Sequence, residues 1–338
     1  MAYDVCEVMK MKKTKVAVLY GGKGYEHDIS VASGKYILKV IDRDRYQPIP
    51  IYIDKNGGWH TDGEREVSLS PTARALEADG IDLGAEVVLP MLHGDYGEDG
   101  SISGLLESVG IPYVGCGVSS GALLADKILT KRLAESIGIP TVPYIPFSRK
   151  NATDELVREV AEGLGYPVFV KPSTLGSSIG AGMANDEEEL RRAIRTVEDL
   201  AKRGLVEKFI DNRREIEVGY LSYGGGEIIT DGGEVSASGW YDYDEKYSDK
   251  STASVIVRAD LDSSQSERLR DYTRRLVDLF GIRQISRLDY FLSGDKIYLN
   301  EINTMPGFTE NSLYPRLISA SGISPTELVT LLIEGARE

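Results

Sequence analysis

The first part of the chain alternates short apolar runs with segments of helical periodicity. Apolar runs bounded by glycine predict buried strands, and apolar positions three and four residues apart predict amphipathic helices between them. A strand–helix–strand order of this kind predicts a parallel α/β domain. The predicted elements are strands at 15–20, 48–54 and 86–92 and helices at 28–41 and 101–109, the last ended by Gly110.

The middle of the chain mixes helices and strands in a different order. A strong helix is predicted at 119–137, and Pro143 and Pro146 then indicate a linker. Beyond this linker the pattern predicts a small α+β domain. Its elements are helices at 153–164 and 186–203, a strand at 167–171 and a return strand near residue 179.

The last part of the chain contains a long polar loop between predicted strands and helices. Residues 231–252 have little apolar periodicity and are rich in Tyr, Asp, Ser and Lys. Loops of this length inside a compact domain are uncommon and often act as lids, so we expect a lid here. The other predicted elements are strands at 205–210 and 215–221, helices at 264–280 and 324–335, and a β-hairpin at 287–302.

These patterns predict an α/β chain, with α+β parts, in three domains. The 338 residues are enough for two or three separate cores. The expected division is a disordered leader at 1–14, a parallel-sheet N-terminal domain at 15–115, a central domain at 116–204 and a C-terminal domain at 205–338.

Composition narrows the classes of function. Hydrophobic residues are 41% and charged residues 27% of the chain, as in ordinary globular proteins. The net charge of −14 argues against a nucleic-acid binder, which would need a basic face. The two cysteines, Cys6 and Cys116, imply no disulfide framework and favour the cytoplasm. Because no apolar stretch is long enough to span a bilayer, we expect no membrane partner.

The predicted hairpin gathers oxygen-bearing side chains at one strand end. Side chains on a strand alternate faces, so Glu301 and Asn303 project from the same side, and Asp289 on the partner strand can face them. Two carboxylates and an amide oxygen suit Mg²⁺, which takes a few carboxylates together with waters and substrate phosphates. A surface hairpin with charged ends would show the same pattern.

A second candidate site begins where the strand at 167–171 delivers Lys171 to a Gly/Ser loop. Gly176 permits close backbone approach, and backbone N–H groups together with Ser177 and Ser178 can hold phosphate oxygens. Lys171 adds a positive charge for a phosphate. The Walker A pattern is absent, and a hairpin turn with a surface lysine is the simpler alternative.

Other segments carry weaker signals. Backbone groups of the strand at 206–210 can receive an adenine, with Glu215 placed for ribose hydroxyls. Glu26, in the glycine-rich turn before the first helix, can bind a cationic amine, while Lys127 can point at a phosphate. Arg287 shares a strand face with Asp289, where it either stabilises a negative oxygen or forms an ion pair.

Six motifs in a fixed order closely resemble the D-alanine–D-alanine ligases, from residue 15 to the C-terminus. The resemblance implies the ATP-grasp fold, in which ATP lies between the central and C-terminal domains. The motifs are GGxxxEHDIS from residue 21, HGxxGEDG from 93, DKxxTK from 126, VKPxxxGSSxG from 170, YDYxxKY from 241 and LNEINTMPGFT from 299.

The resemblance also implies a reaction. ATP phosphorylates one D-alanine to an acyl phosphate, which the amine of a second D-alanine attacks to give D-alanyl-D-alanine, ADP and phosphate. It further implies two Mg²⁺ ions, a role that Mn²⁺ can also fill, a homodimer and a part in peptidoglycan synthesis that sustains the cell wall and cell shape. D-Alanine and ATP are the implied partners.

Motif matches then imply roles for individual residues. The implied ATP-binding residues are Lys127, Lys171, Ser178, Glu207, Lys208, Phe209, Ile210 and Glu215. The implied metal ligands are Asp289, Glu301 and Asn303. The first D-alanine would lie at Glu26 and His93, and the second at Ser312 and Leu313. The implied catalytic groups are Arg287 with the Gly307 N–H as an oxyanion hole, the triad Glu26, Ser177 and Tyr247, and Lys246 on the transferred phosphate.

Three positions bear on the choice of substrate. The pair Lys246-Tyr247 favours an amine as the nucleophile, because relatives that use D-lactate usually carry His in this part of the lid. D-Serine as the second substrate stays open, as does a nucleotide-binding sensor without catalysis. Tyr25 and Tyr290 depart from the residues most frequent in the family, and Tyr25 can alter the first D-alanine pocket.

Overall fold

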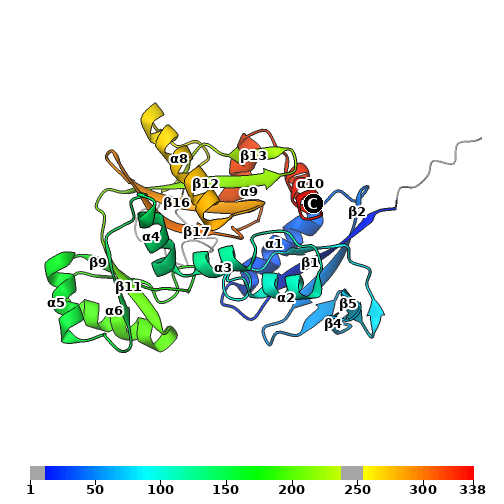
Figure 1. Ribbon diagram of the computed structural model, residues 1–338, viewed down its shortest axis with the longest axis horizontal. Helices are drawn as coiled ribbons and strands as arrows, with labels where there is room; N and C mark the ends of the chain where they lie inside the picture. The colour runs from blue at the N-terminus through cyan, green and yellow to red at the C-terminus, as the bar shows by residue number, and fades with distance from the viewer. Residues whose placement is uncertain (1–11, 237–253) are drawn as a thin grey trace, which may run out of the picture.

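The computed structural model describes residues 12–236 and 254–338 (Figure 1). Its N-terminal sheet has the order β3-β2-β1-β7, with β1 (Thr14–Gly21) parallel to β2 (Tyr46–Ile53) and β7 (Val87–Pro90). The strand β3 (Trp59–Thr61) is antiparallel at one edge. The parallel α/β arrangement predicted from the strand–helix–strand pattern is confirmed.

Both faces of this parallel sheet are buried. Alternate residues of β1 belong to different cores, with Val16 and Val18 in one and Ala17 and Leu19 in the other. Helix α1 (His27–Val40) packs into the first core and α2 (Ser101–Val109) into the second. A strand covered on both faces reads as a continuous apolar run, which explains the sequence pattern at 15–20.

A small antiparallel sheet lies between β3 and β7 in the chain. It consists of β4 (Val67–Ser70), β5 (Ala75–Ala78) and β6 (Ile81–Asp82). The sequence pattern did not predict these strands, because runs of two to four residues are too short for an alternation to stand out.

The single helix predicted at 119–137 is wrong. The chain forms α3 (Val118–Ala125) and α4 (Lys127–Ser136), with Asp126 between them in an extended conformation at φ −97° and ψ 101°. The Asp126 carboxylate accepts N–H groups of Ile128 and Leu129, so it caps α4 and replaces the backbone bonds that the break removes. The break therefore makes Lys127 the first residue of α4.

The central sheet is antiparallel throughout, in the order β10-β9-β11-β8. Its predicted linker is a strand, since Pro146 lies in β8 at the sheet edge, where a missing N–H is tolerated. The strand β11 belongs to this sheet, although the expected division at 204/205 falls within it and assigns its last four residues to the third domain. The elements are β8 (Tyr144–Ser148), α5 (Asp154–Gly163), β9 (Val168–Pro172), β10 (Gly182–Ala184), α6 (Glu187–Leu200) and β11 (Arg203–Lys208).

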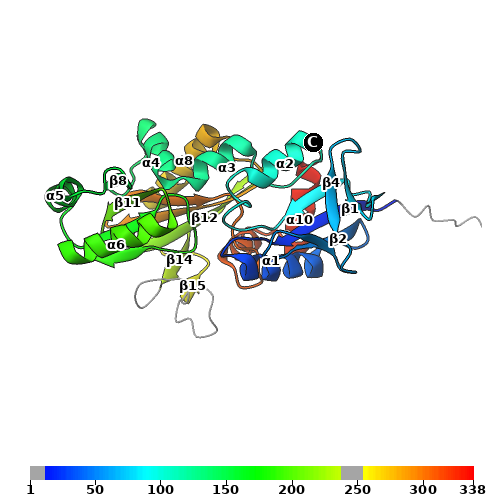
Figure 2. The same cartoon turned by 90° about the horizontal axis from the view of Figure 1, so that it is seen from below.

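The third unit is built on a six-stranded sheet with β12 (Arg214–Tyr223) paired along its length to β16 (Ile285–Ser293). Part of the expected lid at 231–252 is strand, because β14 (Gly233–Ser236) pairs with β12 and with β15 (Ser254–Ile256), as Figure 2 shows. The remaining elements are β13 (Gly226–Ile229), α8 (Ser263–Phe280), β17 (Lys296–Asn303), α9 (Leu313–Ala320) and α10 (Pro325–Gly335).

The predicted hairpin is formed by β16 and β17, and it contains a β-bulge. Pairing continued from the turn without a break would set Asp289 opposite Asn300. The bulge instead sets Asp289 opposite Glu301 and Arg287 opposite Asn303. One extra residue in a strand changes which side chains face the same way, so the bulge decides the composition of the hairpin end.

The C-terminal helices and the N-terminal sheet share one hydrophobic core. Residues of α9 and α10, including Tyr314 and Leu332, are buried in the same cluster as Val16 and Ile37. In Figure 1 the red α10 lies beside the blue α1. The Tyr46 hydroxyl donates to the Glu334 carboxylate across this boundary. The central sheet, by contrast, has a separate core of residues 145–206.

Within residues 12–236 and 254–338, no single helix has both the length and the apolar character of a membrane span. The pair α9 and α10, bent by 97°, meets both criteria together on length and composition alone.

Two helical glycines allow a matched test of the packing between α1 and β1. A Cβ added to Gly34 would lie 2.6 Å from Tyr20 Cγ, whereas one added to Gly104 in α2 would lie 3.5 Å from Val118 Cγ2. We expect Gly34→Ala to lower the free energy of unfolding by about 1–3 kcal/mol through overpacking. Gly104→Ala should raise it by up to about 1 kcal/mol through helix propensity. Urea unfolding followed by circular dichroism measures both, and equal effects would contradict the close packing at Gly34.

Candidate active site at the junction of three units

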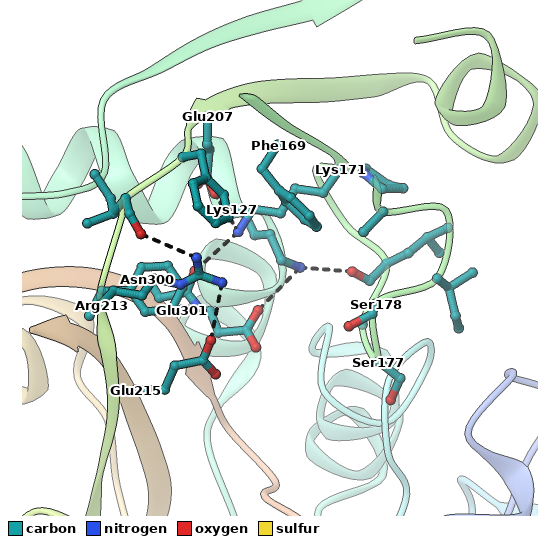
Figure 3. Close-up of a pocket in the computed structure, with 18 of the residues that line it drawn as sticks. Lys127, Phe169, Lys171, Ser177, Ser178, Glu207, Arg213, Glu215, Asn300 and Glu301 are labelled. Atoms are coloured by element: carbon teal, nitrogen blue, oxygen red, sulfur yellow. Dashed lines mark hydrogen bonds and ion pairs between the residues drawn. The ribbon is translucent and has the colours of Figure 1, made fainter. Parts of the chain in front are cut away.

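A cleft opens between the central sheet and the β16–β17 hairpin (Figure 3). Its walls come from β9, β11 and the loop at 172–181 on one side and from β16 and β17 on the other. All eight residues implied to bind ATP line it, together with the implied metal ligand Glu301. The eight are Lys127, Lys171, Ser178, Glu207, Lys208, Phe209, Ile210 and Glu215.

Two lysines enter the cleft from different elements. Lys127, at the start of α4, donates to the Leu175 carbonyl at 2.8 Å and lies 3.8 Å from a Glu301 carboxylate oxygen. Lys171, at the end of β9, lies 2.8 Å from Glu207 and donates to Asn300 at 3.2 Å. Burial lowers the pKa of Lys127, and Lys171 adds to this, while Glu301 opposes it.

Behind the cleft wall is a third lysine that the sequence analysis did not assign to the site. Lys131 Nζ lies 2.7 Å from one oxygen of Glu207, and Lys171 Nζ lies 2.8 Å from the other. Burial by itself raises the pKa of Glu207, but the two lysines outweigh it and hold this pKa below its ordinary range. Lys131 and Lys127 belong to one DKxxTK motif, which was the signal available in the sequence.

Aromatic side chains form the apolar part of the cleft. Phe169 and Phe209 line it, and the Arg213 guanidinium lies between Phe209 at 4.9 Å and Phe291 at 4.7 Å. Arg213 also donates to Glu215 at 3.3 Å. The sequence analysis did not single out Arg213, because its two aromatic neighbours, one just after β11 and one in β16, are far apart in the chain and are brought together only by folding.

At the far end of the cleft, Glu26 of the N-terminal unit meets the Gly/Ser loop. The Ser177 hydroxyl donates to a Glu26 carboxylate oxygen. Ser177 and Ser178 both have positive φ values, 48° and 60°, a backbone conformation that non-glycine residues adopt rarely. A Cβ on Gly176 would lie 3.0 Å from Glu26, so glycine is what allows this approach. Two of the three residues implied to form a triad are therefore in contact, and Tyr247 lies outside the described residues.

The implied metal ligands lie together at the end of the hairpin. Asp289 is the cross-strand partner of Glu301, and the Asn303 amide donates to Asp289 at 3.0 Å. In the described ranges no group of three or more His, Cys, Asp or Glu side chains could hold a metal ion, so the amide oxygen of Asn303 is needed to complete a set of three. Two carboxylates and one amide oxygen are hard donors that fit Mg²⁺ or Mn²⁺ when phosphate oxygens complete the coordination.

Arg287 forms the ion pair with Asp289 that the sequence allowed. Its Nε and one terminal nitrogen donate to the two Asp289 oxygens at 2.8 and 2.7 Å, and its Nε lies 2.9 Å from Glu217. Burial by itself lowers the pKa of Arg287, but Asp289 and Glu217 outweigh it and raise this pKa well above the ordinary value. The guanidinium is therefore held as a fixed positive charge beside the hairpin end.

His93 forms a hydrogen bond with the loop that follows β17. Its Nδ1 lies 2.9 Å from the Met305 carbonyl, and its Nε2 lies 2.9 Å from the Ser33 hydroxyl. The Ser33 oxygen also accepts the Phe308 N–H at 3.2 Å. The Met305 carbonyl can only accept, so Nδ1–H donates to it, and in the neutral ring Nε2 then accepts from the Ser33 hydroxyl. Burial lowers the pKa of His93, which favours this neutral form.

Glu98 is a further buried group that the sequence analysis did not assign a role. Its carboxylate accepts the N–H groups of Gly94 at 3.0 Å and of Met305 at 3.3 Å. Burial first, and then the negative charge of Glu26, raise the pKa of Glu98 to about 8. The backbone N–H of Met305 thus donates to Glu98, and its carbonyl accepts from His93.

The residues implied for the second D-alanine lie at the start of α9. Ser312 is its N-cap residue, and the Ser312 oxygen accepts the Thr309 N–H at 3.0 Å. A Cβ on Gly307 would lie 3.2 Å from this oxygen, so Gly307 and Ser312 are neighbours, and Leu313 follows as a buried residue. Lys246 lies, with Tyr247, in the part of the chain that the structure does not describe.

Family models match nearly the whole chain. Residues 15–116 match the model described as "D-ala D-ala ligase N-terminus", and residues 133–334 match the one described as "D-ala D-ala ligase C-terminus". Between them they cover every motif described above except DKxxTK.

Known proteins and solved structures agree with these matches. The D-alanine–D-alanine ligase of Treponema pallidum is 38% identical over 352 residues, covering 96% of this chain and 88% of the relative. The D-alanyl-alanine synthetase A of Vibrio cholerae has a TM-score of 0.89 at 31% identity, covering 97% of this chain and all of that one. The VanG D-Ala:D-Ser ligase of Enterococcus faecalis has a TM-score of 0.87 at 29% identity, covering 96% and 100%. The family models, the similar sequences and the similar structures all agree, and the chain belongs to the D-alanine–D-alanine ligase family.

Proposed function

We propose that this chain joins two D-alanine molecules to D-alanyl-D-alanine while ATP is cleaved to ADP and phosphate, as a step in peptidoglycan precursor synthesis. One observation supports this above the others. The Ser177–Glu26 hydrogen bond brings a carboxylate of the N-terminal unit to the end of the nucleotide-type cleft. A group that can bind an amino acid's ammonium is thereby placed beside groups that can bind phosphate.

The nucleotide lies in the cleft with its base between the aromatic walls. Glu207 and the backbone of Lys208, Phe209 and Ile210 receive the adenine, and Glu215 accepts ribose hydroxyls. Lys127, Lys171 and Ser178 hold the phosphates, since they contribute two ammonium groups and a hydroxyl to the lining of the cleft. Ser177 and Ser178, which have positive φ values in this loop, would offer backbone N–H groups to a phosphate.

Asp289, Glu301 and Asn303 would hold Mg²⁺, two ions in the expected arrangement, at the phosphate end of the cleft. Mg²⁺ held by these residues would supply positive charge that offsets the charge developing on the transferred phosphate. Mn²⁺ takes the same oxygen donors.

The reaction balances in two transfers. The carboxylate of the first D-alanine attacks the terminal phosphorus of ATP, so that ADP leaves and an acyl phosphate forms. The amine of the second D-alanine then attacks the carbonyl carbon and loses a proton, and the tetrahedral species expels phosphate. Glu26 binds the ammonium of the first D-alanine, near His93, while Ser312 and Leu313 position the second.

Positive and polar groups stabilise the charge that develops in the second transfer. Arg287, held as a cation by Asp289 and Glu217, faces the oxyanion together with the Gly307 N–H. Lys246 would contact the transferred phosphate, and Tyr247 would complete the contact between the lid and Ser177. We further expect a homodimer that acts in the cytoplasm, where ATP is supplied.

The identity of the product tests the function directly. Incubation of the chain with ATP, Mg²⁺ and D-alanine should release phosphate and yield D-alanyl-D-alanine by mass spectrometry, with no release from L-alanine. When D-lactate competes, the D-alanine dipeptide should remain dominant, because an amine nucleophile is expected at the second position, whereas competition with D-serine tests which of two amines is preferred. A mixed D-alanyl-D-serine product would move the chain to a variant specificity, and nucleotide binding without any release would favour a sensor.

Replacement of one implied metal ligand tests whether the end of the β16–β17 hairpin binds a metal ion. Glu301→Gln should lower the rate of phosphate release by about a hundredfold or more, on the scale on which one charge-stabilising group acts. The matched control is Glu310→Gln, whose carboxylate pairs with Lys39 and is 69% exposed, and which should leave the rate near that of the parent. Near-normal turnover by Glu301→Gln would contradict the metal assignment.

A further inference from the structure

Lys131 is a fully buried ammonium group that the proposed reaction does not use. It projects from α4, and its side chain is 0% exposed. It is not among the residues that line the cleft, so it cannot touch a nucleotide there. Removing an ammonium group from water is costly unless an opposite charge compensates it, so a buried lysine in this position is expected to serve a specific partner.

The partner of Lys131 is the residue that faces the base. Glu207 lies in the cleft wall with one carboxylate oxygen 2.7 Å from Lys131 and the other 2.8 Å from Lys171. The Tyr144 ring, 5.5 Å from the Lys131 nitrogen, adds a second favourable contact for the ammonium. The carboxylate is therefore held from behind by Lys131 and from the cleft side by Lys171.

The two lysines are not equivalent once a nucleotide binds. Lys171 lines the cleft and, in the proposed function, turns to the phosphates. Glu207 then loses part of its compensation while it becomes more buried under the base. Without Lys131 it would be a buried carboxylate that takes up a proton or turns away. Lys131 keeps its contact with Glu207, because its side chain is fully buried and does not line the cleft.

We propose that Lys131 is a positioning residue for base recognition, which holds Glu207 ionised and aimed at the exocyclic amine of adenine. The inference rests on the proposed function for Glu207 and extends it to specificity. An ionised carboxylate accepts a hydrogen bond from the 6-amino group of adenine but meets only another acceptor in the 6-keto group of hypoxanthine. Lys131 thereby sets the preference for ATP over inosine triphosphate.

The test compares dissociation constants for ATP and inosine triphosphate by titration calorimetry without D-alanine. In Lys131→Met the preference for ATP should fall by roughly tenfold or more, the loss expected for a hydrogen bond to a charged group. Lys202→Met, an exposed lysine of the same region, is the matched control and should keep the preference. An unchanged preference in folded Lys131→Met, or no preference in the parent chain, would overturn the proposal.

A second comparison decides the matter even where Lys131→Met fails to fold. Glu207→Gln and the double variant Lys131→Met with Glu207→Gln differ only in Lys131, and the double variant carries no unpaired charge at that position. If Lys131 acts through Glu207, both should show the same reduced preference for ATP. A further loss of preference in the double variant would show that Lys131 acts by another route.

These titrations separate the inference from the proposed function. The parent chain can fail to make D-alanyl-D-alanine and still lose its ATP preference on replacement of Lys131, in which case the ligase proposal fails and the role of Lys131 stands. If the chain makes the dipeptide and its ATP preference is indifferent to Lys131, the ligase proposal stands and the role of Lys131 fails.

Discussion

The β-bulge in the β16–β17 hairpin is the constraint on which the geometry of the cleft depends. It shifts the cross-strand partner of Asp289 from Asn300 to Glu301. Asn300 and Glu301 then both line the cleft, although consecutive residues of a regular strand face opposite ways. Asn300 reaches Lys171, and Glu301 lies beside both Asp289 and Lys127. A hairpin of regular register would separate these contacts and split the oxygen donors between two faces.

Two of the buried charges around the cleft are each compensated by two close partners of opposite sign. Glu207 of the central sheet is held by lysines of α4 and β9, and Arg287 is held by two carboxylates of the third sheet. Buried ions are stable only with close partners, so the elements that carry them have little freedom of position. The core that the N-terminal sheet shares with α9 and α10 adds an apolar constraint, since Met305 and Phe308, on either side of Gly307, are buried in it together with β1 and α1.

Much of the fold was predictable because its main elements have strong local signals. The continuous apolar run of β1 and the turn between β16 and β17 each specify their own structure. The errors have physical causes. At Asp126 a capping carboxylate breaks a helix whose apolar spacing continues through it, and at Pro146 an edge strand tolerates a residue that usually indicates a linker. The strands at 67–82 are too short for their alternation to be recognised.

The sequence by itself determined the family, the order of the motifs and the residue types available for phosphate, metal and amine. Those depend on local composition and spacing, which a linear chain carries in full. Only the tertiary structure decided that Lys131 stands behind Glu207, that Arg213 lies between two phenylalanine rings, and that Glu98 and His93 hold Met305. These contacts join residues far apart in the chain, and they follow from a bulge, a helix break and a shared core rather than from any local pattern.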